Sequence, residues 1–129
     1  MTLDQLCLTA LDMRANAYNP YSHFAVGAAL ECADGTVFTG CNIENAAYSP
    51  TICAERVAVV KAVSEGYTQF CRIAIASSGD DICVPCGVCR QVLSEFATDL
   101  EVICLSSDGK RKTFTLKELL PHSFGASQL

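Results

Sequence analysis

Three cysteines and one glutamate have the residue types and the spacing of a catalytic metal site. Glu55 follows Cys53 by two residues, and Cys86 and Cys89 stand three residues apart further along the chain. Three thiolates can hold zinc at three corners of a tetrahedron and leave the fourth open for water, whereas structural zinc sites close with four protein ligands. The pattern therefore predicts an open zinc centre with a carboxylate beside it for proton transfer.

The spacing also separates the ligands from the carboxylate. Cys86 and Cys89 are one helical turn apart, so both sulfurs can face one point. Cys53 and Glu55 occupy positions i and i+2, which do not share a helix face. We therefore expect Glu55 to approach the water molecule rather than to act as a fourth ligand.

Two arginines beside these residues are candidates for charge compensation. Three thiolates around Zn²⁺ leave a net charge of about −1, which opposes deprotonation of a water molecule at the metal. Arg56 follows Glu55 directly, and a guanidinium that donates hydrogen bonds to a thiolate withdraws charge from it. We expect Arg56 to take this role, with Arg90, next to Cys89, as a second candidate.

Other uses of the cysteines remain open at this level. A lone C-x-x-C can be a redox pair, but the chain has no Trp and no thioredoxin-like pattern around the motif. A structural zinc would need a fourth ligand, for which His23, His122 and Cys83 are available. The cysteines outside the motifs are interpreted as small buried hydrophobic residues: Cys7, Cys32, Cys41, Cys71, Cys83 and Cys104.

Composition narrows the class of protein. The chain has 129 residues, which suits one domain spanning 1–129, and it is 50% hydrophobic and 18% charged. This is apolar for a small monomer, so part of the surface is expected to contact other subunits. An odd count of nine cysteines, without a secretory signal, argues against a disulfide framework and favours the cytoplasm. The net charge of −5, with scattered basic residues, argues against binding to nucleic acid. No apolar run approaches the length of a membrane-spanning helix.

Hydrophobic periodicity and turn residues predict the elements that position the motifs. Capping boxes at Thr2–Gln5 and Thr115–Glu118 open the first and last helices. The two central helices each begin at a cysteine of the metal motif, and Gly66 ends the first of them. The expected helices are 3–17, 53–65, 86–97 and 116–120, and the expected strands are 24–32, 37–43, 72–77, 101–105 and 113–115.

The order of these elements predicts the fold. A helix and a hairpin are followed by alternating strands and helices, which favours a mixed sheet of about five strands in a three-layer α/β/α sandwich. The N-termini of both cysteine-bearing helices would then converge at one edge of the sheet.

Three segments of the chain resemble the short-chain, homotetrameric, zinc-dependent cytidine deaminases. They are 40–48 (GCNIENAAY), 53–56 (CAER) and 85–91 (PCGVCRQ), and the similarity extends from Pro20 to Pro121. The resemblance implies zinc on the three cysteines and hydrolysis of cytidine or 2′-deoxycytidine in pyrimidine salvage. Glu55 would take a proton from water, protonate N3 of the base and then protonate the amino group that leaves C4 as ammonia.

The resemblance also implies how the substrate is held. The backbone N–H of Ala54 would bind the O2 carbonyl, and Asn42 and Glu44 would bind the ribose 3′-hydroxyl. Phe24 would pack on the base. Tyr48 and Phe124 would line neighbouring sites across subunit boundaries in the homotetramer.

Rival functions make different demands on the sequence. A deaminase of a nucleoside-like antibiotic such as blasticidin S shares the chemistry, but Asn42-Ile43-Glu44-Asn45 favours the plain nucleoside. A non-catalytic zinc module that binds RNA or protein needs a fourth ligand and a basic or apolar patch, and a polynucleotide editor needs a basic channel. Because Glu44 would repel a nearby 5′-phosphate, we expect a free nucleoside substrate and no nucleic-acid or membrane partner.

Overall fold

A mixed sheet of five strands forms the middle layer of the protein, for which a computed structural model describes all residues 1–129. The strands lie in the order β2-β1-β3-β4-β5. β3 and β4 run parallel, and the other neighbouring pairs are antiparallel. The strands are β1 (Val26–Cys32), β2 (Val37–Cys41), β3 (Phe70–Ser77), β4 (Glu101–Leu105) and β5 (Arg111–Thr115).

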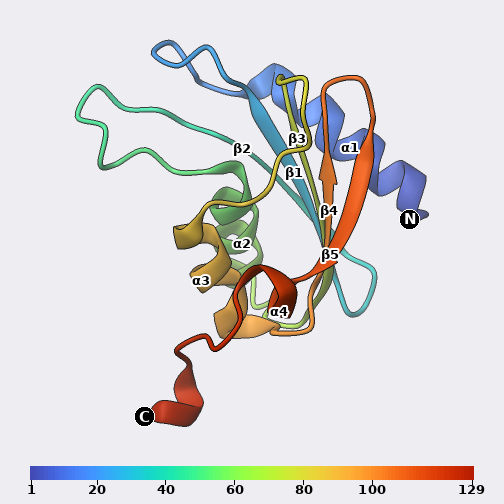
Figure 1. Cartoon of the computed structure of the whole chain (residues 1–129), viewed down its shortest axis with the longest axis vertical. Coiled ribbons are helices and arrows are strands. Elements are labelled where there is room, and N and C mark those ends of the chain that lie inside the picture. Colours follow the sequence, from blue (N-terminus) through green and yellow to red (C-terminus); the bar gives the residue numbers. More distant parts are fainter.

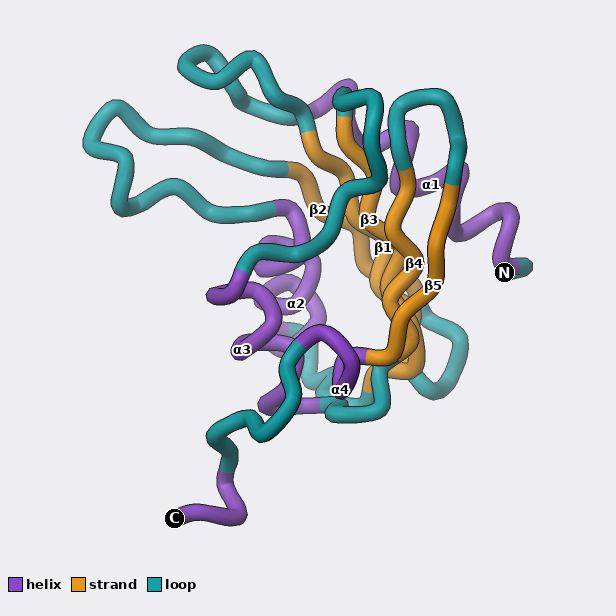
Figure 2. The backbone as a smooth tube through the Cα atoms, viewed as in Figure 1, coloured by secondary structure: helices purple, strands orange, loops and turns teal.

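Helices cover both faces of the sheet, which confirms the α/β/α sandwich (Figure 1). α1 (Leu3–Met13) lies on one face, and α2 (Ala54–Ser64) and α3 (Gly87–Phe96) lie on the other. The short α4 (Leu116–Leu119) follows β5, and 3₁₀ turns occur at Arg14–Asn16 and Ala126–Gln128. No helix combines the length and the apolarity needed to cross a membrane. Figure 2 shows the loop before β1 and the loop between β2 and α2 projecting from the sheet. The second of these loops leads into α2.

Alternation along the strands divides the core between the two faces. Leu30 and Ile73 belong to the larger buried cluster, which the sheet forms with α2 and α3. Their neighbours Ala29 and Ala74 belong to the smaller cluster, which packs against α1. Successive side chains of a strand point to opposite faces, so small residues on the α1 face allow that helix to lie close to the sheet.

Two glycines of the β1–β2 hairpin allow helices on opposite faces to approach closely. A Cβ on Gly27 would lie 2.1 Å from the carbonyl oxygen of Ala10 in α1. A Cβ on Gly40 would lie 2.2 Å from the carbonyl oxygen of Ala54 in α2. Gly40 therefore lets the first turn of α2 rest directly on β2.

The predicted elements are present, but some boundaries differ. The first helix, expected over 3–17, ends at Met13 and is followed by the 3₁₀ turn at Arg14–Asn16. β1 begins at Val26 rather than Phe24, because the side chain of Asn42 binds the backbone N–H of Val26 and the carbonyl of Phe24. β2 ends at Cys41 rather than 43. β3 and β5 each begin two residues earlier than expected, because pairing with β1 and β4 extends them.

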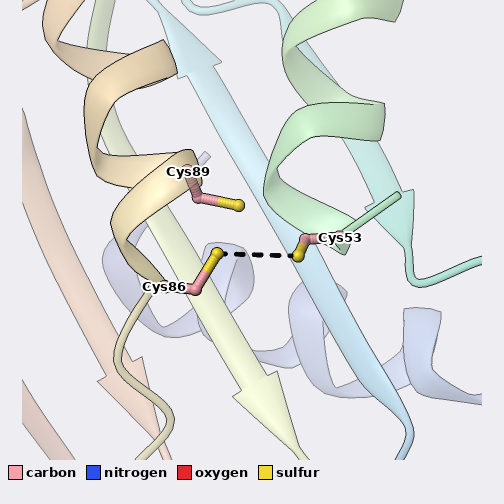
Figure 3. Close-up of side chains that lie close together, drawn as sticks. All are labelled: Cys53, Cys86 and Cys89. Carbon is pink, nitrogen blue, oxygen red and sulfur yellow. Dashed lines mark hydrogen bonds between the residues drawn. The ribbon is translucent and has the colours of Figure 1, made fainter. Parts of the chain in front are cut away.

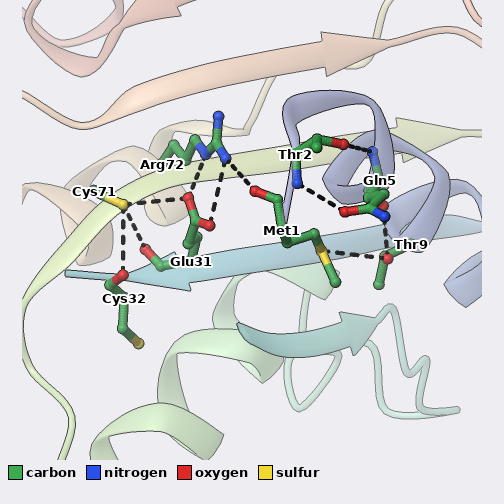
Figure 4. Close-up of polar contacts among 8 residues, drawn as sticks. All are labelled: Met1, Thr2, Gln5, Thr9, Glu31, Cys32, Cys71 and Arg72. Carbon is green, nitrogen blue, oxygen red and sulfur yellow. Dashed lines mark hydrogen bonds and ion pairs between the residues drawn. The ribbon is translucent and has the colours of Figure 1, made fainter. Parts of the chain in front are cut away.

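Polar contacts fix the start of α1 to the sheet (Figure 4). Both predicted capping boxes are confirmed, and in the first the N–H of Gln5 donates to the Thr2 hydroxyl at 3.1 Å. Arg72 forms an ion pair with Glu31 on the neighbouring strand, and its Nη2 donates to the carbonyl of Met1 at 3.0 Å. The cross-strand pair thus also holds the chain terminus.

The cysteines outside the metal motifs do not all occupy the buried positions expected of them. Cys7, Cys32, Cys41 and Cys104 are buried, whereas Cys83 is half-buried and Cys71 is exposed. Cys71 lies near the start of β3, where the strand is less covered, and its thiol donates to the carbonyl of Glu31 at 3.4 Å. The expectation for Cys71 was therefore wrong.

Candidate zinc centre and active site

Cys53 and Cys86 occupy the N-cap positions of α2 and α3. Both have extended backbones (φ −73°, ψ 154° and φ −68°, ψ 168°), and neither side chain makes a capping hydrogen bond. The usual N-cap residues are Ser, Thr, Asp and Asn, whose side-chain oxygens accept from an N–H of the first turn. The two thiols are instead free to turn toward each other, and both lie at the positive end of a helix dipole.

The sulfur atoms of Cys53, Cys86 and Cys89 converge between the two helix N-termini (Figure 3) and lie within 4.8 Å of one another. The Sγ atoms of Cys53 and Cys86 are 3.8 Å apart. Tetrahedral zinc with Zn–S bonds of about 2.3 Å places two sulfurs about 3.8 Å apart. The spacing of this pair therefore fits zinc, and the chemistry of the donor set fits it as well.

The cluster contains three ligand residues and no fourth. His23, His122 and Cys83, which were the candidates for closing a structural site, are not part of it, and neither is Glu55. The geometry therefore contradicts the four-ligand structural alternative. It corresponds to the type of zinc site that keeps a position for water or substrate.

Arg56 lies against one of the sulfurs. Its Nη2 donates a hydrogen bond to Cys53 Sγ at 3.4 Å. The neighbouring Cys89 thiol and the guanidinium of Arg56 lower the pKa of Cys53. The Nε of Arg56 is buried without a hydrogen-bond partner, so the guanidinium that contacts Cys53 keeps an unused donor at this atom.

Arg90 makes different contacts from those expected of it. Its Nε donates to the carbonyl of Pro85 at 2.7 Å, and its Nη1 donates to the carbonyl of Leu119 at 2.7 Å. Both acceptors are backbone oxygens and not thiolates. Arg90 therefore braces the segment before Cys86 and does not compensate charge on a sulfur by hydrogen bonding.

Glu55 is a buried carboxyl in the first turn of α2. It is 4% exposed and lines a cavity together with Cys53 and Cys86. Burial raises the pKa of Glu55 to about 7, and negative charge on Cys53 adds to the rise. A group with a pKa near the working pH both accepts and donates protons efficiently.

The cavity in front of Glu55 has a volume of about 260 Å³. Four residues that the sequence analysis assigned to the substrate lie together on its wall: Phe24, Asn42, Glu44 and Ala54. They come from the segment before β1, the segment after β2 and the first turn of α2. Phe24 is 42% exposed, so its ring is not a core residue of the single chain.

Asn42 connects the two segments that form this wall. Its Oδ1 accepts from the N–H of Val26 at 2.8 Å, and its Nδ2 donates to the carbonyl of Phe24 at 2.8 Å. A primary amide has two N–H donors and two lone pairs. One donor and one lone pair of Asn42 therefore remain for a ligand.

Glu44, which lies in the segment after β2, holds the loop before β1 through its carboxylate. Its Oε1 accepts from the backbone N–H groups of Tyr21 and Ser22 at 2.9 and 3.1 Å, and its Oε2 accepts from the Ser22 hydroxyl. The hydroxyl is the main cause that lowers the pKa of Glu44. Glu44 is therefore ionised at neutral pH.

Tyr48 and Phe124 do not line the cavity with Glu55. Tyr48 lines a neighbouring cavity of about 410 Å³ that shares Ser22, Glu44 and Thr51 with it. Phe124 is 59% exposed, and its carbonyl accepts from Gln91 Nε2 at 3.0 Å. Figure 1 shows the C-terminal segment projecting away from the loop between β2 and α2.

Sequence reasoning did not assign several residues to the substrate cavity, although Cys83 was considered as a fourth zinc ligand. They are Ser22, Val26, Thr51, Ile52, Cys83 and Val84. Ser22 belongs to a turn, and nothing in the sequence signals that its hydroxyl binds Glu44, 22 residues away. Cys83 and Val84 directly precede the Pro85-Cys86 motif. That proximity was a signal which could have identified them.

A three-thiolate centre with room for a fourth ligand, beside a buried carboxyl at a cavity, defines a zinc-dependent hydrolytic enzyme. The model of the family "Cytidine and deoxycytidylate deaminase zinc-binding region" matches residues 1–105, and the chain belongs to this family.

Relatives and solved structures agree with this assignment. The chain is 43% identical to the cytidine deaminase of Sporosarcina psychrophila, covering all of this chain and 96% of the relative. It is 44% identical to a probable cytidine deaminase of Dictyostelium discoideum, covering 98% of this chain and 86% of the relative. The crystal structure of cytidine deaminase from Burkholderia pseudomallei superposes with a TM-score of 0.93 at 42% identity, covering 96% of this chain and all of that one.

Proposed function

We propose that the protein is a cytidine deaminase, which hydrolyses cytidine and 2′-deoxycytidine to uridine and 2′-deoxyuridine with release of ammonia. The observation that carries the proposal is the buried carboxyl of Glu55 at the cavity that Cys53 and Cys86, two of the three converging thiols, also line. The family membership and the named relatives support the same reaction.

In this proposal Glu55 carries out the proton transfers, and three cysteines would hold the zinc. Zinc held by Cys53, Cys86 and Cys89 would lower the pKa of a water molecule, so that hydroxide is available at neutral pH. Glu55 accepts the proton of this water and passes it to N3 of the cytosine ring, which makes C4 more electrophilic. Hydroxide adds to C4. Glu55, again a carboxylate, then takes the proton of the new C4 hydroxyl and passes it to the amino group on C4, which leaves as ammonia while the C4 oxygen becomes a carbonyl.

The wall of the cavity suits an uncharged nucleoside. In this proposal Phe24 packs on the base, and the N–H of Ala54, in the first helical turn where N–H groups lack helical partners, binds O2. The remaining polar atoms of Asn42 and the carboxylate of Glu44 bind the ribose 3′-hydroxyl. No Lys or Arg lines the cavity, and the ionised Glu44 disfavours a 5′-phosphate.

Arg56 is proposed to compensate the charge of the thiolates. Its hydrogen bond to Cys53 Sγ and its unused Nε donor support this role. A guanidinium that withdraws charge from a sulfur makes the metal more electron-poor, which favours deprotonation of water.

Homotetrameric assembly, with active sites near the subunit interfaces, is part of the proposal. Apolar side chains remain exposed on the outer faces of α2 and α3, among them Val60 at 52% and Val88 at 57%. Tyr48 and Phe124 are 72% and 59% exposed in the single chain, which would let them complete sites in neighbouring subunits. Thiolate ligands among nine free cysteines suit the reducing cytoplasm and a role in pyrimidine salvage.

The test is the change in ultraviolet absorbance of cytidine with purified protein. We expect turnover of cytidine and 2′-deoxycytidine, loss of turnover after chelation, and recovery when zinc is returned. Cytidine 5′-monophosphate, which differs only by the phosphate, should react much more slowly. Glu55→Gln serves as the matched inactive variant. Turnover that survives complete removal of metal would refute the proposed chemistry. Blasticidin S is assayed as an alternative substrate, because its turnover in place of cytidine would favour the rival function, a deaminase of a nucleoside-like antibiotic.

A further inference from the structure

The carbonyl groups on both sides of Cys53 are held by backbone hydrogen bonds. The carbonyl of Ile52, which precedes Cys53, accepts from the N–H of Ile43 at 3.0 Å in an isolated β-bridge. The carbonyl of Cys53 itself accepts from the N–H of Val57 at 3.1 Å. Both peptide groups that flank the sulfur-bearing residue are thus fixed.

Cys86 is not preceded by such a β-bridge. Instead, Arg90 alone donates the hydrogen bonds to the carbonyl groups on both sides of the Cys86 nitrogen and Cα. The carbonyl of Pro85, which precedes Cys86, accepts from the side-chain Nε of Arg90 at 2.7 Å. The carbonyl of Cys86 accepts from the backbone N–H of Arg90 at 3.0 Å. Arg90 therefore fixes the two peptide groups that set the direction of the Cys86 side chain.

The guanidinium is itself held in place by the C-terminal part of the chain. Its Nη1 donates to the carbonyl of Leu119 at 2.7 Å, at the end of α4, where helix carbonyls lack helical partners. α4 is anchored by Leu116, which is buried in the core. The fork geometry of arginine allows Nε and Nη1 to serve two acceptors at once, which a lysine ammonium on its flexible stem does not reproduce.

We propose that Arg90 is a positioning residue for the zinc ligand Cys86: it replaces, with one side chain, the strand bridge that orients Cys53. The role is exerted through the Pro85–Cys86 peptide group and requires no contact between Arg90 and the metal or the substrate. Residues that orient metal ligands typically change metal affinity by about 10- to 100-fold when they are replaced.

The test compares Arg90→Met with Arg14→Met. Arg14 makes the same kind of contacts, since its Nε donates to the carbonyl of Leu11 at 2.8 Å and its Nη1 to the carbonyl of Ser77 at 3.0 Å. Each variant loses two hydrogen bonds from a guanidinium to carbonyls, but Arg14 contacts no residue of the metal motif. Zinc affinity is measured by competition with a chromophoric chelator, and ligand geometry by the visible spectrum of the Co²⁺-substituted protein.

We expect Arg90→Met to weaken zinc binding about tenfold or more and to shift the Co²⁺ bands, while Arg14→Met stays within about twofold of the parent protein. Arg90→Lys keeps the charge without the fork and should fall between the parent and Arg90→Met; it also serves as the test if the methionine variant does not fold. Equal zinc affinity in the parent, Arg90→Lys and any folded Arg90→Met would overturn the inference.

This inference rests on zinc binding in the proposed function, and the assay separates the two. A parent protein that binds no zinc contradicts the proposed function. A parent protein that binds zinc as tightly as its Arg90 variants contradicts only the role of Arg90.

Discussion

Replacing Gly40 by alanine should damage the active site by moving the helix that carries two of its residues. The new Cβ would lie 2.2 Å from the carbonyl oxygen of Ala54 and 2.7 Å from the backbone nitrogen of Ala58, whereas ordinary contacts begin at 3.4 Å. The first turn of α2 must therefore separate from β2 by about 1.2 Å, the difference between the required and available distances to the Ala54 oxygen. Ala54 stands between Cys53 and Glu55, so both move with it.

The expected loss has two parts of known size. A displacement of about 1 Å at reacting groups costs about a hundredfold in kcat/KM. Overpacking of this kind lowers the free energy of unfolding by about 1–3 kcal/mol, which outweighs the gain of about 0.4–1 kcal/mol from restricting the unfolded chain. Cytidine turnover and denaturant unfolding measure these two losses, and the zinc content of the same preparation shows whether the site still holds its metal.

Gly27→Ala is the matched control. Its Cβ would meet the carbonyl oxygen of Ala10 at 2.1 Å, but it pushes on α1, on the opposite face of the sheet. We expect a similar loss of stability with zinc content and kcat/KM close to those of the parent protein. If Gly40→Ala and Gly27→Ala lower stability equally and Gly40→Ala still has normal kcat/KM and zinc content, the claim that close packing of α2 on β2 positions the site is wrong.

Three further predictions concern side chains of the site. Glu55→Gln should lower turnover by about 10²- to 10⁴-fold. The same variant tests the pH dependence of stability, because folding raises the pKa of Glu55 from 4.5 to about 7. The contribution of Glu55 to the free energy of unfolding is therefore favourable below pH 4.5 and is lost as the pH rises to about 7. The glutamine variant of the metal-free protein should therefore gain up to about 3 kcal/mol over the parent above pH 7 and nothing at pH 4; unfolding at several pH values checks this, and an identical pH dependence of the two proteins contradicts it. Arg56→Ala should lower kcat by a larger factor than it lowers the zinc content, with turnover and elemental analysis measured on one sample. An unchanged kcat would count against charge compensation by Arg56. Phe124→Ala should lower kcat/KM without changing the zinc content, and light scattering of the same sample reports its assembly. Full activity of this variant would contradict a role of Phe124 in the active site.

The cavity wall illustrates how much of the site could be predicted. Asn42 and Glu44 were recognised through a resemblance, but their partners in this chain, the backbone of Phe24 and Val26 and the loop at Ser22, come from long-range hydrogen bonds. The role of Arg90 was misjudged for the same reason. Its sequence neighbour Cys89 suggested a contact with sulfur, whereas folding brings the carbonyl of Leu119 to its guanidinium.

The amino-acid sequence by itself determined the ligand set, the carboxyl beside it, the alternation of strands and helices and the capping boxes. Within each motif and each element, these features depend on neighbours a few residues apart, where helix and strand periodicity dictates which side chains face the same way. Only the tertiary structure decided that two cysteine-capped helices point at one spot, that Glu55 is buried enough to raise its pKa, and that Arg90 donates to the carbonyl of Pro85 rather than to a sulfur. Each of these depends on the distance between segments that are far apart in the chain, and that distance is set by the packing of helices on the sheet.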